Sequence, residues 1–396
     1  MVRWHIGPLP TTLLEALIGI TVAAYVATLW SEKRLPRART PFDVPIALFL
    51  LAGTIGIVVA PDQLRALGIY RAYFLEAIAC FYISVDLLRT REDVVTFLKI
   101  AGTGCCLMAV GQIATFAISV ANEPLDVSGA PAFLNTSPNA DAMFLEPPFA
   151  FAVAFALFPS RPRERWVAAA AAALILAALV TALSRGSFLA IAVLAAVLVL
   201  SQQSPRWRLR AVAATAIAGL LILEIPFVNQ RFLSLADSIN NRESLWRQTF
   251  QMLAHNPILG AGISGYPVLV APYRPPLQPI HLYPHNIWLT TWSDVGLLGL
   301  VAFAVIFFGL LWRGWRALPY TTDINRPVLW GAVGALILYT VHGMVDSPYW
   351  KNDLSVEFWL LAALQVVAVR STRLSRSDAE RLAIPESPQV VLEKHT

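Results

Sequence analysis

Residues 287–312 read IWLTTWSDVGLLGLVAFAVIFFGLLW, and Asp294 is their one charged side chain. A helix needs roughly 20 mostly apolar residues to cross a bilayer core that is about 30 Å thick. This stretch meets that requirement, so we expect it to span a membrane. Because it is longer than a bilayer requires, we expect the helix to tilt or to extend beyond the bilayer.

Apolar blocks of similar length recur along the chain. Hydrophobic types make up 57 % of the 396 residues and charged types 14 %, whereas a soluble domain carries about 25 % charged residues. We therefore predict an all-α, polytopic membrane bundle of about eleven spans, at residues 11–30, 42–60, 69–88, 94–120, 140–158, 166–183, 187–201, 209–228, 286–312, 327–345 and 354–370.

The basic residues concentrate in the odd-numbered connections between these blocks, for example at 33–39, 161–165 and 206–210. Cytoplasmic connections of membrane proteins carry an excess of Lys and Arg. We therefore predict that these connections and the C-terminus face the cytoplasm and that the N-terminus lies outside. This distribution accounts for the net charge of +5 without a nucleic-acid partner.

The even-numbered connections are then external, and the one at 229–285 is long enough to fold. We predict a transmembrane domain over 1–371 that includes this external cap, followed by a polar, disordered cytoplasmic tail over 372–396. The three cysteines lie inside apolar blocks, which argues against a disulfide framework or a zinc site. We accordingly expect no metal.

Arg185, in the run TALSRGSFLA, is the first candidate for chemistry, because it lies at the outer end of two apolar blocks. An arginine near lipid is costly unless it snorkels, pairs or does work. It either caps a short hairpin, in which Gly186 allows the tight turn, or binds an anion in an outward cavity.

The run NNRESLWRQTFQMLAHNPILGAG, at 240–262, predicts a helix in the external cap that Pro257 and the glycines end. Arg242 and Trp246 are four residues apart and share a face, whereas Arg247 points elsewhere. Arg242 either meets lipid headgroups or turns toward an anion. The cap residue is expected at Asn240 or Asn241, and the apolar face at Leu245, Trp246, Phe250 and Leu253.

A literal GxGxxG follows at 260–265. A dinucleotide site needs a preceding strand and a following helix, but here Pro267 follows almost at once. We expect a flexible turn.

His285 and Asn286 open the span at 286–312. A histidine titrates near neutral pH and can act as a general base, but here it also fits an interfacial aromatic belt. Asp294 and Asp346 either orient a cation or lie in water. Glu146, inside an apolar block, should face the protein interior.

The predicted topology places Arg185, Arg242 and His285 on the outer side together. Two guanidinium forks match the oxyanions of a pyrophosphate and stay charged. A neutral histidine nearby suits deprotonation of a sugar hydroxyl.

The order and spacing of these motifs resemble the O-antigen ligase and O-antigen polymerase superfamily of bacterial membrane glycosyltransferases. The resemblance covers about residues 130–365 and depends on four places. They are PNADA at 138–142, SRG at 184–186, NRxxxW with NPxxGxG at 241–262, and HN at 285–286 with the following Asp294.

The resemblance implies a GT-C-like helical enzyme in the bacterial inner membrane, with a periplasmic catalytic loop. It implies transfer of a glycan from an undecaprenyl-pyrophosphate donor to a glycan or lipid A-core-like acceptor, with inversion and with no metal or other cofactor. By position, Arg185 and Arg242 would bind the donor pyrophosphate and His285 would be the catalytic base. Supporting roles would fall to Asn286, Asp294 and Arg247.

A membrane transporter or anion channel for a small or lipid-linked solute is the alternative. Transporters usually show inverted repeats or broken helices in matching positions. The sequence contains no internal repeat, and its polar residues gather on one side of the predicted membrane. Ligase and polymerase share their chemistry and differ in acceptor, so the sequence leaves both open.

Overall fold

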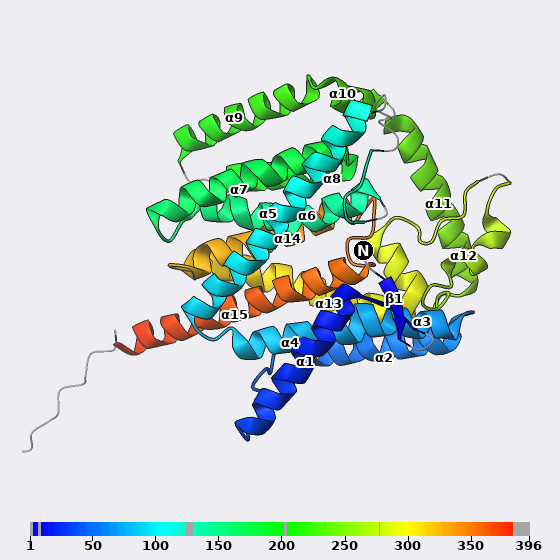
Figure 1. Ribbon diagram of the computed structural model, residues 1–396, viewed down its shortest axis with the longest axis horizontal. Helices are drawn as coiled ribbons and strands as arrows, with labels where there is room; N and C mark the ends of the chain where they lie inside the picture. Colours follow the sequence, from blue (N-terminus) through cyan, green and yellow to red (C-terminus); the bar gives the residue numbers. More distant parts are fainter. Residues whose placement is uncertain are drawn as a thin grey trace, which may run out of the picture.

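The computed structural model describes residues 3–6, 9–122, 130–135, 137–201, 204–233, 235–276 and 278–382. Most of the long helices lie side by side in one bundle, with α11 and α12 at one end and the end of α15 at the other (Figure 1). The helices are α1 Leu13–Ser31, α2 Asp43–Val59, α3 Gln63–Tyr70, α4 Ala77–Leu87, α5 Arg91–Asn122, α6 Pro138–Leu157, α7 Pro162–Thr181, α8 Arg185–Leu200, α9 Pro205–Leu223, α10 Pro226–Leu233, α11 Leu235–His255, α12 Tyr266–Leu269, α13 Ile287–Ala317, α14 Asn325–His342 and α15 Asn352–Leu382.

The predicted spans all overlap these helices, and the third comprises α3, a π-helical turn at Arg71–Glu76 and α4. Within the described ranges, seven helices are long and apolar enough to cross a membrane, and α2 and α8 are apolar but shorter. The prediction of a helical, multi-pass membrane fold is therefore confirmed. The total of eleven spans stays a prediction.

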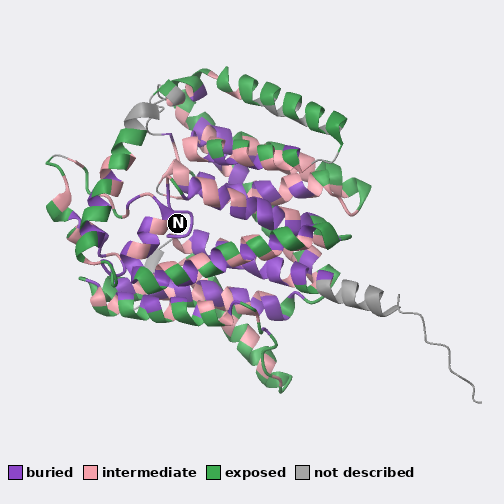
Figure 2. Ribbon diagram, turned by 180° about the vertical axis from the view of Figure 1, so that it is seen from behind, coloured by how far each residue is buried: buried purple, intermediate pink, exposed green. Residues whose placement is uncertain are grey.

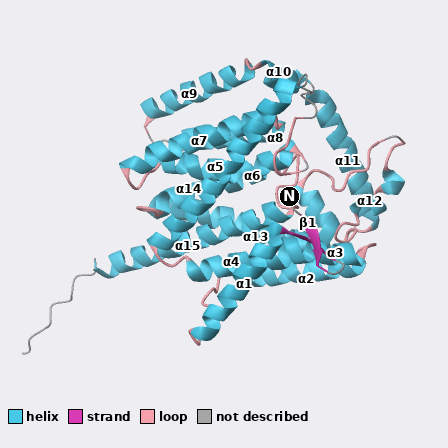
Figure 3. Cartoon of the chain, in the orientation of Figure 1, coloured by secondary structure: helices cyan, strands magenta, loops and turns pink. Residues whose placement is uncertain are grey.

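A short antiparallel hairpin at the N-terminus departs from the all-helical prediction. Its strands are β1 Arg3–Ile6 and β2 Leu9–Thr12 (Figure 3). Strands of four residues carry too little alternation to stand out in a sequence.

The outer faces of several helices are exposed (Figure 2), and many of the exposed residues are large and apolar. Ile20 of α1, Ile100 of α5 and Leu220 of α9 are each more than 60 % exposed. Contiguous apolar surface is rare on soluble proteins, but it suits lipid. The interior is aromatic instead, and Phe303 of α13 contacts the rings of Phe49, Tyr349 and Phe358.

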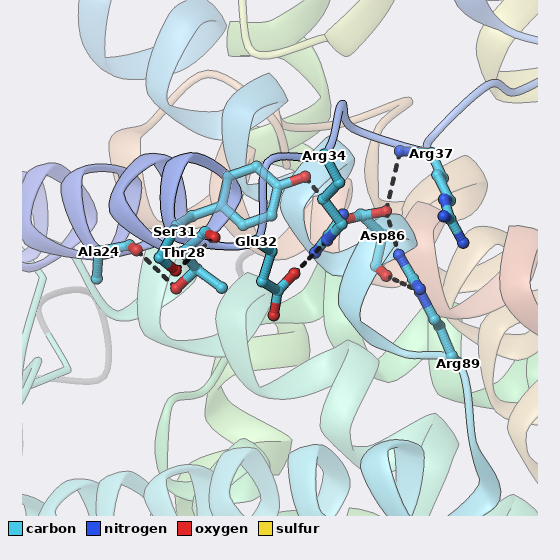
Figure 4. Close-up of polar contacts among 9 residues, drawn as sticks. Ala24, Thr28, Ser31, Glu32, Arg34, Arg37, Asp86 and Arg89 are labelled. Atoms are coloured by element: carbon cyan, nitrogen blue, oxygen red, sulfur yellow. Dashed lines mark hydrogen bonds and ion pairs between the residues drawn. The ribbon is translucent and has the colours of Figure 1, made fainter.

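The basic connection at 33–39 is anchored at the end of the bundle opposite α11. Asp86, at the end of α4, is 1 % exposed. It accepts hydrogen bonds from Arg34 Nη1 and Arg89 Nη2, each at 2.7 Å (Figure 4). Arg370 of α15 donates to the Arg39 carbonyl at 2.7 Å, so this connection and α15 share one end.

Helix α15 runs to Leu382, past the boundary at 372 that we predicted for the tail. The sequence gives no signal for the end of this helix, because no Gly or Pro follows Arg370 until Pro385. Residues 383–396, which we predicted to be disordered, lie outside the described ranges.

Helix α13 is interrupted where the cap meets the bundle. Gly296 has φ 68° and ψ −173°, and Leu297 N donates to the Ile258 carbonyl at 2.8 Å instead of continuing the helix. A Cβ at residue 296 would lie 2.4 Å from that carbonyl oxygen. The glycine therefore permits the loop after α11 to insert against α13.

Candidate active site

A histidine–carboxylate pair lies where the cap meets the bundle. His285 precedes α13, and Asp346 lies between α14 and α15. Nδ1 of His285 is 3.1 Å from Oδ1 of Asp346. The Asp346 side chain is 2 % exposed, whereas that of His285 is 27 % exposed. The carboxylate selects the tautomer with hydrogen on Nδ1, which leaves Nε2 as an acceptor.

Asp346 stays charged in this setting. Burial raises the pKa of its carboxyl, but the neighbouring His285 ring and the Arg242 guanidinium outweigh burial and hold that pKa well below its usual range. Asp346 therefore does not lie in water, which was one of the two roles that we considered from the sequence. A second oxygen, Oδ2, accepts from Asn139 Nδ2 at 3.3 Å.

The backbone around His285 is held in a fixed shape. His285 has φ 51°, a region that non-glycine residues seldom adopt. Asn286 caps α13 by accepting from Trp288 N and Leu289 N, and its Nδ2 donates to the Met344 carbonyl at 3.0 Å. Asn286 therefore orients His285 toward the turn that carries Asp346.

Arg242 on α11 reaches the same turn. Its Nε donates to the Val345 carbonyl at 2.6 Å. Trp246, one helical turn later, donates from Nε1 to the Pro284 carbonyl at 3.1 Å. The shared face that we predicted for Arg242 and Trp246 thus contacts both the residue before His285 and the residue before Asp346.

Helix α11 differs in detail from the prediction. It begins at Leu235, so Asn240 and Asn241 lie inside it and not at its cap. Asparagine destabilises a helix interior by well under 1 kcal/mol relative to alanine, and the packing of α11 against the rest of the protein outweighs this cost. Phe250 is 54 % exposed and does not belong to the packed face, where Thr249 and Met252 are buried.

Arg185 is the first residue of α8. Its Nη1 donates to the Arg231 carbonyl at 3.3 Å, and Arg231 Nε donates to the Leu183 carbonyl at 3.2 Å. The tight turn before α8 has its positive φ at Leu183, 52°, and not at Gly186 as we expected.

Gly186 instead allows α8 to approach α14. A Cβ at this position would lie 2.6 Å from Cδ2 and from Nε2 of His342. His342 is four residues before Asp346, and its carbonyl accepts from Asp346 N at 2.9 Å. Arg242 and His285 therefore both contact the turn at 342–346. Arg185 instead bonds the Arg231 carbonyl, and its neighbour Gly186 lies beside His342.

Two of the predicted supporting residues are engaged elsewhere. Arg247 is exposed and forms an ion pair with Glu243 at 2.9 Å, so it points away from the site, as its spacing from Arg242 predicted. Asp294 is buried and accepts from Ser264 N at 3.4 Å, so it anchors the loop after α11.

The glycine-rich motif forms a packed turn and not the flexible turn that we expected. Gly260 and Gly262 have φ 69° and 78°. Ala261 N donates to the Ser293 carbonyl, and Ile263 N donates to the Gly56 carbonyl. A helix, α11, precedes the motif in place of the strand that a dinucleotide site needs.

Sequence reasoning missed His342 and the pairing role of Asp346. Asn139 belongs to the PNADA motif, which was a signal for this region, but nothing in the sequence pairs residues 139, 285 and 346. Glu146 does face the interior, and its Oε1 lies 2.6 Å from His342 Nδ1. Across the described ranges, no group of three or more His, Cys, Asp or Glu is arranged to hold a metal ion.

The fold and this site together define a multi-pass membrane protein that has a histidine–carboxylate pair and Arg242 where the cap meets the bundle. A family model described as O-Antigen ligase matches residues 169–304. The matched segment contains Arg185, Arg242 and His285, and the match supports the O-antigen ligase and polymerase superfamily. The match indicates a membrane glycosyltransferase of this type. No curated protein matches the chain.

Proposed function

We propose that this protein transfers a glycan from an undecaprenyl-pyrophosphate carrier to an acceptor hydroxyl at the outer face of the bacterial inner membrane. The observation that carries this proposal is the His285–Asp346 pair, with Nδ1 bonded to a buried carboxylate. The arginine of α11 is bonded one residue away, at Val345.

His285 is the base in this reaction. Its Nε2 takes the proton of the acceptor hydroxyl while that oxygen attacks the anomeric carbon of the donor sugar. The bond from the anomeric carbon to the pyrophosphate oxygen breaks, and its electron pair leaves with the lipid pyrophosphate. Asp346 orients the ring and stabilises the imidazolium that forms. One displacement inverts the configuration at the anomeric carbon.

Arg242 and Arg185 carry the donor pyrophosphate in this proposal. Guanidinium groups match its oxygens in a planar fork and remain charged at all relevant pH values. Arg185 is also at the N-terminus of α8, where the helix dipole favours an anion. These positive charges neutralise the leaving group as it departs, and the reaction as proposed requires no metal.

The proposed orientation follows from charge. The basic connection at 33–39 and Arg370 share the end of the bundle opposite α11 (Figure 1). Positive connections face the cytoplasm, so the cap and the site face the periplasm, where the acceptor glycan is soluble.

The test uses the full-length protein in detergent, a purified lipid-pyrophosphate glycan and a candidate acceptor. His285→Ala should abolish formation of the glycan product and leave yield and gel-filtration position unchanged. His255→Ala is the matched control, because His255 is exposed on the cap and bonds Tyr273, and it should keep full activity. Near-normal product from His285→Ala would refute the proposal.

A deletion strain separates the two acceptor classes. Loss of long surface chains with one unit still attached indicates a polymerase, whereas loss of every attached unit indicates a ligase.

A further inference from the structure

Three polar side chains form a buried cluster in the interior of the bundle, behind the candidate site. Ser187 Oγ donates to Glu146 Oε1 at 2.6 Å, and His342 Nδ1 lies 2.6 Å from the same oxygen. All three residues are at most 1 % exposed. They come from α6, α8 and α14.

The cluster joins the segments that hold the candidate site residues. Ser187 is two residues after Arg185 on α8. The His342 carbonyl accepts from Val345 N and from Asp346 N, each at 2.9 Å. Glu146 therefore ties the helix that begins with Arg185 to the turn that bonds both His285 and Arg242.

Stability alone is a weak reason for such a cluster. Buried polar groups cost free energy unless they are fully hydrogen-bonded, and well-packed apolar replacements of buried ion pairs are often neutral or stabilising. Glu146 Oε2 has no hydrogen-bond partner among the described residues. The arrangement is thus better suited to fixing a geometry than to stabilising the fold.

We propose that Glu146, Ser187 and His342 are positioning residues that set the distance between the donor-binding end of α8 and the turn that orients the catalytic base. This inference rests on the proposed function. The cluster acts through hydrogen-bond geometry, because Glu146 Oε1 serves as the common acceptor for the two other side chains.

Ser187→Ala removes one of the two hydrogen bonds and almost no volume. A single buried hydrogen bond is worth about 1 kcal/mol, so the donor KM should rise roughly three- to tenfold. The acceptor KM and kcat should stay within about twofold of the native values, because the His285–Asp346 pair is untouched. Loss of fold alone would lower the amount of active protein and not change the donor KM.

The matched control is Ser293→Ala. Ser293 is also fully buried, but its hydroxyl has no partner among the described residues, so the donor KM should not change. Glu146→Gln keeps Oε1 as acceptor and should retain a donor KM close to native, whereas Glu146→Ala should raise it at least as much as Ser187→Ala. If Glu146→Ala does not fold, the donor KM values of Ser187→Ala and Glu146→Gln still test the inference.

Equal donor KM values for Ser187→Ala and Ser293→Ala would overturn the inference. So would a Glu146→Gln enzyme whose donor KM has risen as much as that of Ser187→Ala. Either result, with His285→Ala still inactive, leaves the proposed function intact. Full activity of His285→Ala would instead remove the proposed function on which the inference depends.

Discussion

Replacing Asp346 by Asn should slow catalysis strongly while the fold and donor binding remain. The amide has the same shape, and its oxygen can still accept from His285 Nδ1, as Oδ1 does at 3.1 Å. Two features are lost: the negative charge, and the second acceptor oxygen that Asn139 contacts at 3.3 Å.

The expected magnitude follows from the charge. Hydrogen bonds to charged groups contribute about 1.5–3 kcal/mol and neutral ones about 0.5–1.5 kcal/mol. The difference acts on the imidazolium, which forms only as the proton is transferred. The two ranges differ by about 1–1.5 kcal/mol. Because about 1.4 kcal/mol corresponds to a factor of ten in rate, we expect kcat to fall roughly 5- to 12-fold. The donor KM should change less than about threefold, since the arginines are unaltered.

The assay is the initial rate of product formation from a purified lipid-linked glycan, measured as the donor concentration is varied. Asp141→Asn is a suitable control, because Asp141 is also buried but bonds the backbone of residues 133–135. An Asp346→Asn enzyme with the native kcat would show that Asp346 does not orient the base.

Three further changes test other parts of the structure. Arg242→Lys keeps the charge but loses the fork, so the donor KM should rise about tenfold; an unchanged KM would remove its role in donor binding. Gly186→Ala places a Cβ 2.6 Å from His342 and should destabilise the protein by about 1–3 kcal/mol. Gly102→Ala, with nothing within 4 Å, should be neutral or stabilising by up to about 1 kcal/mol, and equal melting temperatures for the two would contradict the close approach of α8 and α14. Asp86→Asn should lower stability by about 3 kcal/mol, because two guanidiniums lose a common carboxylate, while kcat of the folded fraction stays native; a lowered kcat would contradict a purely structural role.

The helices were predictable because each apolar block is long enough to be decided by composition alone. Arg313 and Arg316 explain why α13 runs past the predicted boundary at 312 to Ala317. Their guanidiniums lie over the rings of Phe42 and Trp312, so the last turns remain covered although the sequence has become basic. A prediction from hydropathy ends the span at the first charged residue, whereas the helix itself continues for as long as its residues are packed.

Only those features of the site that depend on the spacing of nearby residues were predictable from the sequence. The four-residue spacing of Arg242 and Trp246 correctly predicted a shared face. The partner of His285 is 61 residues away, and no local pattern connects them. Asp346 follows an apolar block as an ordinary polar residue would, and only the packing of α14 on α6 and α8 buries it.

The orienting half of the site lies outside the segment that the family model matches. Residues 169–304 supply Arg185, Arg242 and His285, but the carboxylate on His285 belongs to residue 346 and the amide on that carboxylate to residue 139. The acceptor common to Ser187 and His342 is at residue 146. A fragment restricted to the matched segment would contain Arg185, Arg242 and His285 but would lack the partner residues at 139, 146 and 346. The proposed site therefore needs the bundle around the 342–346 turn, to which α6 and α14 contribute in addition to the matched segment.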